Sequence, residues 1–534
     1  MAAAVALIAD VAIVGAGLCG LALARTLHAR GLQVAVLEAR PWPGGRVRTE
    51  ACEATGQPLD LGAAWLWPDT EPRIAALLDE LGLQHFAQHD PGDSLWLIDP
   101  NRACERRQEA PGAVHAGAHR MAGGTARLVA ALADGLPAGA LRTGHAVQVV
   151  RDRGATIELL CEGGRSLRAR RVVLALPPRL VAERVRFDPP LPLAVQEALA
   201  AVPTWMAAQA KALTSHDRAF WRADGHSGNA FVRHPQAVLG EVFDASAPDQ
   251  DAGALGGFVA LDAAQRTHFL RGLPMLVESQ LAQLYGPEAQ HGRLHLMDWA
   301  LEPWTCSAAD RAGPPEPPQA SALLRQPLWA GRLFFGGTET ATHGAGHMEG
   351  ALDAADRLAH RLAPPAAGAP EAGPPPGGRE EGIAAFAAAV AALREAAPER
   401  YRMHLTRLLS SQQSSQLTQR ALLACADQTY SEALARLDVL RPVVQGAVGE
   451  GMQDGRHAAT AALLAPFEGW NKALLDGALR FNATSCALSN FPEEHRPDAE
   501  SLRAMTLDLA AAWREFALEL NSRLLVGDGM RRAA

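Results

Sequence analysis

Three glycines with a fixed spacing lie near the N-terminus. They follow the apolar run Val11–Val14, precede a helical pattern that ends near Ala29, and stand in the sequence Gly15, Ala16, Gly17, Leu18, Cys19 and Gly20. In this G-x-G-x-x-G order the first glycine permits a tight turn, the second lets the backbone approach a diphosphate, and the third lets the helix pack closely on the strand. The positive end of the helix dipole also favours phosphate. The segment therefore predicts that the chain binds a dinucleotide.

An acidic residue ends the next apolar run. Residues 33–37 have the pattern of a second strand, and Glu38 follows directly. A carboxylate at this place accepts hydrogen bonds from both ribose hydroxyls and repels a 2′-phosphate. The acid therefore favours an adenosine with a free ribose over NADP.

A second glycine pair follows, in the order Ala39, Arg40, Pro41, Trp42, Pro43, Gly44, Gly45 and Arg46. Its backbone N–H groups and the Arg46 cation can reach the same diphosphate, which NAD sites do not usually require. Small residues then precede a large aromatic side chain in the run Gly62, Ala63, Ala64 and Trp65. Because small residues suit a flat ring system lying against backbone, the segments together favour FAD.

These residues carry a family resemblance. The pattern E-A-R-x-x-x-G-G-R at 38–46 and D-L-G-A-x-W at 60–65 resembles the flavin-containing amine oxidases, which include monoamine, polyamine and L-amino-acid oxidases. Three later stretches are similar to the same family: 172–192, a lysine followed ten residues later by tryptophan at 211–221, and 334–351. The resemblance spans residues 10–362, and the order of its motifs is that of the family.

The resemblance implies a fold, a reaction and a set of site residues. The implied reaction oxidises an amine to an imine, with a hydride equivalent passing to flavin N5, and O2 then reoxidises the flavin to give hydrogen peroxide. Besides the glycine segments, it places at the cofactor Val147, Ala175, Trp304, Gly337, Thr338, Glu339, Gly346, His347 and Met348. We expect a strand at Leu333–Phe335 and a helix from 346 to 361, with Leu352 and Leu358 buried and Asp353, Asp356 and Arg357 outward.

Lys211 is an unusual residue in this chain. The sequence has 50 basic residues, and Lys211 and Lys472 are the two lysines among them. A buried ammonium can lose its proton and can hold one water, whereas a guanidinium does neither easily. In the family, the matching lysine binds a water near flavin N5, and the resemblance implies this catalytic role for Lys211.

The match is weaker where the family has its aromatic substrate cage. Trp299, a predicted catalytic residue, and Trp304 fit the aromatic positions before the cage, but one cage wall falls near Ala309 and the other on His347, which is also implied at the reaction site. A paired-tyrosine cage is thus not expected, which argues against simple arylalkylamine substrates. Cys306 lies two residues from the register of covalent flavin attachment, so we expect FAD to be bound non-covalently.

Composition excludes several other classes of protein. The net charge of −8 argues against a nucleic-acid partner. Seven cysteines without C-x-x-C spacing argue against a disulfide scaffold or a zinc site, and four histidine pairs spaced i,i+4 lack a completing carboxylate, so we expect no metal. The apolar N-terminus lacks a basic flank and is interrupted by Asp10, so we expect no membrane span and a cytoplasmic protein.

The fold class we expect is α/β, with an all-α domain at the C-terminus. A Rossmann-like FAD-binding domain would comprise 1–68, 120–190 and 305–362, and an interleaved α+β substrate domain would comprise 69–119 and 191–304. A Pro/Gly/Ala linker at 363–382 would precede a helical bundle at 383–534, punctuated by prolines that include Pro398.

Other functions remain open at this point. The chain could be an L-amino-acid oxidase, with Arg233 or His347 for the substrate carboxylate, or a flavin desaturase or oxidase acting on a C–C bond. It could also be an FAD-holding scaffold whose helices bind a protein partner. The helical region could equally form a homodimer. The sequence specifies neither which amine is the substrate nor the role of the helical region.

Overall fold

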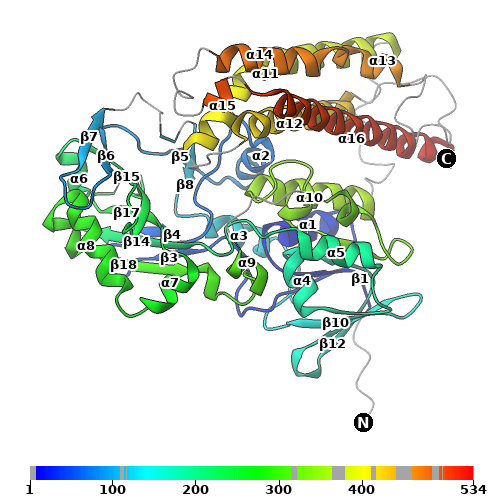
Figure 1. Cartoon of the computed structure of the whole chain (residues 1–534). Coiled ribbons are helices and arrows are strands. Elements are labelled where there is room, and N and C mark those ends of the chain that lie inside the picture. The colour runs from blue at the N-terminus through cyan, green and yellow to red at the C-terminus, as the bar shows by residue number, and fades with distance from the viewer. Residues whose placement is uncertain are drawn as a thin grey trace. The chain divides into compact units, whose positions relative to one another are not determined.

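The computed structural model describes residues 8–108, 114–115, 117–248, 250–313, 321–363, 379–410, 416–440, 460–483, 492–495 and 497–532. The chain forms two compact units, Met1–Pro364 and Pro365–Ala534. The first unit has mixed α/β structure, whereas the second is built from helices (Figure 1). Among the described residues, no helix is long and apolar enough to cross a membrane.

An eight-stranded sheet organises the nucleotide-binding part of the first unit. Its strand order is β13-β10-β11-β12-β1-β2-β9, and β19 pairs with β12. The strands are β1 (Ile8–Val14), β2 (Val34–Leu37), β9 (Leu141–Arg142), β10 (Val147–Asp152), β11 (Ile157–Cys161), β12 (Ser166–Leu174), β13 (Arg186–Asp188) and β19 (Leu333–Phe335). The parallel pairs β2–β1, β1–β12 and β12–β19 confirm the predicted Rossmann-like arrangement.

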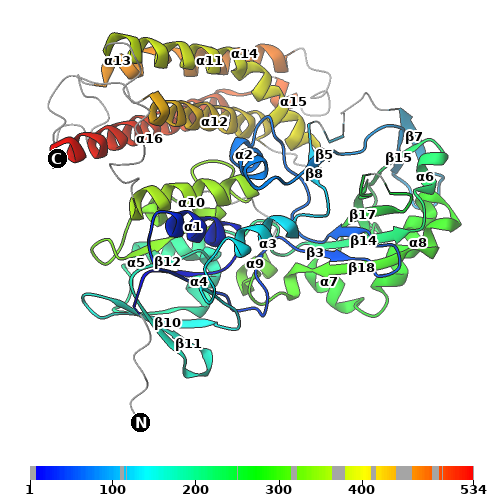
Figure 2. The same cartoon turned by 180° about the vertical axis from the view of Figure 1, so that it is seen from behind.

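Both faces of this sheet are covered. Val11 and Ile13 of β1 face one core, which contains α1 (Leu18–Ala29), α3 (Ala126–Asp134) and α10 (Met348–Leu362). Ala12 and Val14 face the opposite core, with α4 (Pro178–Arg184) and α5 (Leu193–Ala201). Because side chains alternate along a strand, the uninterrupted apolar run of β1 supplies both faces. Figures 1 and 2 show α1 and α10 side by side over the sheet.

A seven-stranded sheet forms the second part of this unit. Its order is β18-β14-β17-β16-β15-β6-β7. The strands are β6 (Asp93–Leu97), β7 (Glu105–Gln108), β14 (Ala210–His216), β15 (His226–Val232), β16 (Leu239–Asp244), β17 (Gly253–Val259) and β18 (Arg293–Asp298). Its helices are α6 (Phe220–Ala223), α7 (Ala263–His268) and α8 (Leu273–Tyr285), and α2 (Pro72–Leu81) and α9 (Ala308–Ala312) belong to the same unit.

A β-hairpin and a second two-stranded sheet complete this unit. β3 (Thr49–Ala51) pairs with β4 (Pro58–Asp60), and β5 (His85–Ala87) pairs with β8 (His119–Met121). The β3–β4 hairpin leads directly into the segment that carries Gly62 and Trp65.

The second unit has its own apolar core. Its helices are α11 (Arg379–Ser410), α12 (Leu417–Leu440), α13 (Ala461–Leu464), α14 (Trp470–Asn482), α15 (Pro492–His495) and α16 (Ala499–Arg532). Inside it, Asn482 accepts a hydrogen bond from Tyr401 at 2.8 Å and donates one to Thr418 at 2.6 Å. A buried Asn that is satisfied in both directions fixes how these helices pack.

Two details of the sequence interpretation were wrong. Pro398 was expected to interrupt the helical region, but it lies inside α11. Asp353 was expected to point outward from α10, but it is 4% exposed. An arginine and a threonine from other segments satisfy this carboxylate, as described below, and such distant partners are invisible to helical periodicity.

Candidate active site

The first glycine turn cannot accept side chains. Gly15 has φ +103°, and a Cβ there would lie 2.5 Å from the carbonyl oxygen of Ala175. A Cβ at Gly20 would overlap the carbonyl oxygen of Gly15. Ala175 in turn donates its N–H to Val14 at 2.8 Å, which holds the end of β12 beside the turn. The motif therefore brings three stretches of backbone into contact at the carboxyl end of the sheet.

The second glycine pair meets this turn. Gly44 donates its N–H to Ala16 at 2.8 Å, and a Cβ at Gly45 would lie 3.2 Å from the Cα of Gly17. By contrast, a Cβ at Gly17 would meet nothing closer than Gly45, at 3.9 Å. The two loops thus touch at Gly17 and Gly45, and a methyl group on Gly17 would enter a cradle in which only Gly45, of the other described residues, comes within 4 Å.

Glu38 is buried between the two loops. Its Oε2 accepts the N–H of Ala16 at 2.8 Å and its Oε1 accepts the N–H of Arg40 at 3.0 Å, across the intervening Ala39. Each oxygen keeps a second lone pair for another donor. The Arg40 guanidinium is also buried, and it donates to Thr305 at 2.6 Å.

A second buried carboxylate, Glu339, pairs with the arginine that follows the second glycine pair. Glu339 is 0% exposed and pairs with Arg46, whose Nη2 lies 2.7 Å from its Oε1. Its Oε2 has no hydrogen-bond partner among the described residues. A buried acceptor in this condition needs a donor, because burial without one is costly.

The turn before Glu339 is held by α1. Gly337 donates its N–H to the Cys19 sulfur at 3.2 Å. Burial raises the pKa of the Cys19 thiol to about 11, so this cysteine acts as a packed neutral group. Thr338 donates to the carbonyl of His347 at 2.8 Å, which ties the turn to the start of α10.

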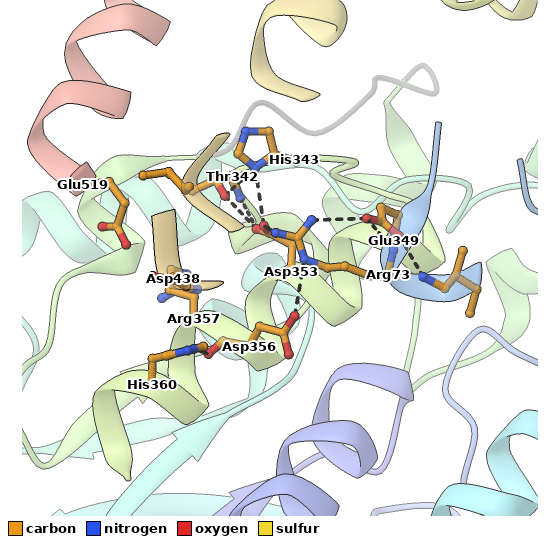
Figure 3. A network of polar contacts seen from close by, with 12 residues as sticks. Arg73, Thr342, His343, Glu349, Asp353, Asp356, Arg357, His360, Asp438 and Glu519 are labelled. Atoms are coloured by element: carbon orange, nitrogen blue, oxygen red, sulfur yellow. Dashed lines mark hydrogen bonds and ion pairs between the residues drawn. The ribbon is translucent and has the colours of Figure 1, made fainter. Parts of the chain in front are cut away.

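The first turn of α10 is anchored by a polar network that no sequence motif signalled (Figure 3). Glu349 accepts the backbone N–H groups of Arg73 and Ile74, both at 3.0 Å, where α2 begins. The Arg73 guanidinium contacts Glu349 at 3.2 Å and Asp353 at 3.1 Å. Burial raises the pKa of Glu349 to about 7.

Asp353 connects the same network to the loop after Glu339. It accepts both the N–H and the hydroxyl of Thr342, at 2.7 and 2.8 Å. Burial alone would raise the pKa of Asp353, but His343 and the charge of Arg73 hold it well below its ordinary value. The network therefore fixes Gly346, His347 and Met348 relative to both α2 and the 338–342 turn.

The three residues at the start of α10 have different surroundings. Gly346 has φ +86°, and a Cβ there would lie 2.9 Å from the ring of Trp205. His347 approaches Glu71, with Nδ1 3.8 Å from Oε1, and Met348 is buried. Trp205 was not predicted as a site residue, because only the fold brings it to this glycine.

Lys211 lies on β14 of the seven-stranded sheet and reaches the end of β4 and the segment that follows it. It is 3% exposed, and its Nζ donates to the carbonyls of Asp60 at 2.8 Å and Gly62 at 3.0 Å. Burial lowers the pKa of Lys211 to about 7. Near neutral pH this side chain is therefore present both as an ammonium and as an amine, and each form keeps one position for a further hydrogen bond.

Aromatic rings surround the Lys211 nitrogen. The ring centroids of Trp65, Phe243 and Phe258 lie 5.6, 5.4 and 5.6 Å from Nζ. Trp299 donates its indole N–H to Leu61 at 3.0 Å. Trp299 and Lys211 thus both hold the 60–62 segment, and Gly62 is required there because a Cβ would overlap the Arg46 carbonyl oxygen.

The remaining predicted residues have different placements. Ala63 donates its N–H to Arg46 at 3.1 Å and Ala64 is buried, so both belong to the segment beside Lys211. Val147 is buried in the sheet core at the start of β10. The Trp304 ring lies under the Arg184 guanidinium at 5.0 Å.

The histidine pairs do not assemble a metal site in the part of the chain that the structure describes. His85 and His119, which belong to two different i,i+4 pairs, instead contact each other through Nδ1 atoms 2.8 Å apart. His115 lies beside Trp65 and contacts two carboxylates, a cluster to which we return below.

Comparison with known proteins identifies the family to which this chain belongs. The family model described as flavin containing amine oxidoreductase matches residues 92–363, just over half of the chain. The chain belongs to this family. The model of an NAD(P)-binding Rossmann-like domain also matches, over residues 13–81.

Individual relatives of the family are similar over the same part. Pig amine oxidase [flavin-containing] B is 25% identical, with 66% of this chain and 86% of that protein covered. The human enzyme of the same name is 24% identical with the same coverage. Two solved structures share the fold: putrescine oxidase bound to putrescine (24% identity, TM-score 0.56, 67% and 99% coverage) and cyclohexylamine oxidase from Brevibacterium oxydans (23%, 0.55, 67% and 99%).

The family implies FAD, and the residues present fit it. The Gly17 backbone is open where a Cβ would stand, so a diphosphate can approach it closely, and Glu38 has lone pairs left for a ribose. The buried Oε2 of Glu339 lacks a donor among the described residues. This donor and acceptor set matches what a dinucleotide offers.

The glycine cradle gives a first prediction. We expect Gly17→Ala to fold but to lose FAD affinity at least about tenfold, because its methyl group fills only the gap that backbone leaves for the diphosphate. Gly20→Ala should impair folding itself. Gly240→Ala is the control, since its Cβ would make an ordinary 3.5 Å contact. Flavin absorbance per protein after desalting, together with circular dichroism, measures both effects, and full FAD occupancy in Gly17→Ala would contradict the assignment.

The buried lysine gives a second prediction. Lys211 has a pKa of about 7 when folded and an ordinary value of 10.5, so between these values the unfolded chain binds more protons. Its contribution to the free energy of unfolding therefore rises with pH in that window, by at most about 1.4 kcal/mol per pH unit. We expect the free energy of unfolding of wild type to exceed that of Lys211→Met by an amount that increases from pH 7 to 10. Urea unfolding, monitored by flavin release, measures this difference.

Lys472→Met is the matched control for this measurement. Lys472 is 80% exposed and pairs with Asp476, so its substitution should give a difference that does not change over the window. A pH-independent difference for Lys211→Met as well would show that Lys211 is not buried as an amine.

Proposed function

We propose that this chain is an FAD-dependent oxidase that converts an amine to an imine, with O2 as the electron acceptor and hydrogen peroxide as a product. The observation that carries the proposal is the buried Lys211, which keeps a free hydrogen-bonding position inside a ring of aromatic side chains beside the Gly62 segment. When bound, FAD would supply the two-electron chemistry of the reaction. The amine substrate would enter from the side of the seven-stranded sheet.

The nucleotide-binding residues divide the work of holding the cofactor. The backbone of Ala16, Gly17 and Gly45 would hold the diphosphate, and Glu38 would hold the ribose. Glu339 would accept a hydrogen bond from the chain that joins the diphosphate to the ring system. The N-terminus of α10, with His347 and Met348, would direct its positive end toward that ring.

Lys211 would act on a water. As an ammonium, it has a third N–H after donating to Asp60 and Gly62; as an amine, it has a lone pair instead. In both forms one water can be held at the Nζ, and a pKa of about 7 lets the group give or take a proton near neutral pH. This is why an arginine at the same place would not serve.

The surrounding rings would prepare the substrate. Trp65, Phe243 and Phe258 exclude water and offer π faces to a nitrogen. A charged ammonium loses hydration in such a site, which favours the neutral amine. The neutral form is also the one whose lone pair can assist loss of hydride from the adjacent carbon.

Non-covalent attachment of FAD is supported by the state of Cys306. The thiol is buried, and burial, with the negative charge of Asp310, raises its pKa to about 11. It donates to the carbonyl of Ser307 at 3.5 Å. A buried neutral thiol is a poor nucleophile, because the thiolate is the reactive form.

Anaerobic mixing tests the reaction. We expect a panel of amines to bleach the flavin absorbance, with a bleaching rate that rises with pH as the substrate amine becomes neutral. Stopped-flow spectroscopy measures this rate, and peroxide release in air reports the acceptor. A flat pH profile would contradict the requirement for a neutral amine, and bleaching by amino acids alone would favour the L-amino-acid oxidase alternative.

Acid precipitation tests the mode of attachment. Because no reactive thiolate is expected at Cys306, we expect the flavin to remain in the supernatant when the holoenzyme is precipitated with trichloroacetic acid. The absorbance of the pellet and supernatant measures this partition. Flavin that stays with the pellet would overturn the non-covalent assignment.

A further inference from the structure

Four polar side chains meet beside Trp65, and the mechanism above uses none of them. His115 donates from Nδ1 to Asp90 at 3.0 Å, and its Nε2 lies 3.7 Å from Glu241. Asn229 donates from Nδ2 to the same Asp90 oxygen at 3.1 Å. The residues come from three different parts of the chain, so this cluster is a product of the fold.

The cluster carries a net negative charge. Burial alone would lower the pKa of His115, but Asp90 and Glu241 outweigh it and raise the pKa to about 9. His115 is therefore an imidazolium between two carboxylates at neutral pH. Arg233, a cation that interacts electrostatically with Glu241, is exposed and donates to the backbone of Gly240 at 3.0 Å, so solvent screens it.

One buried acceptor in this cluster lacks a donor. Oδ1 of Asn229 is buried in a side chain that is 1% exposed, and it has no hydrogen-bond partner among the described residues. The Glu241 carboxylate is partly buried, at 12% exposed, and its Oε1 lies 3.7 Å from His115 Nε2, beyond normal hydrogen-bond length. A buried acceptor without a donor indicates a missing ligand group that donates, and the partly open carboxylate beside it can meet a positive charge on that group.

The seven-stranded sheet places these acceptors in line with Lys211. Phe258 pairs with Lys211 on one side and with Glu241 on the other, so all three side chains lie in one row on the same face of the sheet. Lys211 and Glu241 are two strand spacings apart, about 10 Å between Cα atoms. The Trp65 ring bridges the gap, with its centroid 5.6 Å from Lys211 Nζ and 5.2 Å from the His115 ring.

We propose that Glu241 and Asn229 bind a second cationic group of the amine substrate, while Asp90 and His115 hold them in place. The proposal rests on the amine oxidase function and narrows it to amines that carry another ammonium a few methylene groups from the reacting nitrogen. The row of the sheet then orients the substrate, with its reacting end at Lys211 and its far end at Glu241. A bound cation brings the buried charge of the cluster to zero.

A pair of substrates that differ only at the far end tests the inference. 1,4-Diaminobutane and 1-aminobutane have the same chain length, and one carries an ammonium where the other has a methyl group. We expect wild-type holoenzyme to prefer the diamine by at least about tenfold in kcat/KM for flavin reduction. Glu241→Gln keeps the shape and removes the charge, so it should reduce that ratio to near one.

Glu105→Gln is the matched control. Glu105 is an exposed carboxylate on β7 of the same sheet, and its loss should leave the substrate ratio as in wild type. Flavin content and melting temperature of each variant confirm that it is folded. No preference for the diamine in wild type, or a preference that survives in Glu241→Gln, overturns the inference.

Binding can be separated from oxidation. The dithionite-reduced holoenzyme cannot oxidise an amine, so calorimetric titration with the two compounds reports affinity alone. Tighter binding of 1,4-diaminobutane that depends on Glu241 supports the subsite, whether or not the compounds bleach the flavin. If neither compound bleaches the flavin, that result counts against the proposed oxidation and not against the subsite. Equal binding of both compounds by wild type overturns the subsite.

Discussion

The close approach of backbone segments at glycines is the constraint on which the site depends. Gly15 and Gly62 each stand where a Cβ would overlap or crowd a carbonyl oxygen of another segment, and a Cβ at Gly20 would overlap the Gly15 carbonyl oxygen within the same turn. Gly62 brings the chain against Arg46, and Lys211 and Trp299 then hold that same segment from the seven-stranded sheet. A continuous series of contacts thus runs from the nucleotide turn to the aromatic cluster. The backbone segments in this series can approach one another only because glycine stands at the contact positions.

Buried charge fixes the other side of the site. The start of α10 would not stay in place by apolar packing alone, because Glu349 and Asp353 are buried on the same helix. The Arg73 guanidinium and the backbone N–H groups at the N-terminus of α2 offset the charge of both carboxylates. These contacts tie α2 to the start of α10, some 270 residues later in the chain. The residues expected at the flavin therefore owe their position to partners that are themselves remote from it.

The features of the fold and site that the sequence could predict are those encoded by residues close together in the chain. The G-x-G-x-x-G turn, Glu38 and the second glycine pair lie in one stretch of the chain, and β19 was predicted at Leu333–Phe335, where it forms. The outward placement of Asp353 was wrong because its partners lie far along the chain. The same holds for the cluster of Asp90, His115, Asn229 and Glu241: His115 was visible only as one of several spaced histidines. Trp205 against Gly346 also had no sequence signal, since no motif joins them.

The strand order of the larger sheet has a consequence for biosynthesis. β1 lies between β2 and β12, yet β12 begins about 150 residues after β1 ends, and β19 begins only after roughly another 160 residues. During translation, one edge of the first strand therefore emerges from the ribosome without its neighbour, and an apolar run with free backbone groups is prone to wrong pairing. The nascent chain must keep this edge protected until the segment around Leu174 has been synthesised, so chaperone demand should be greatest in the first third of elongation.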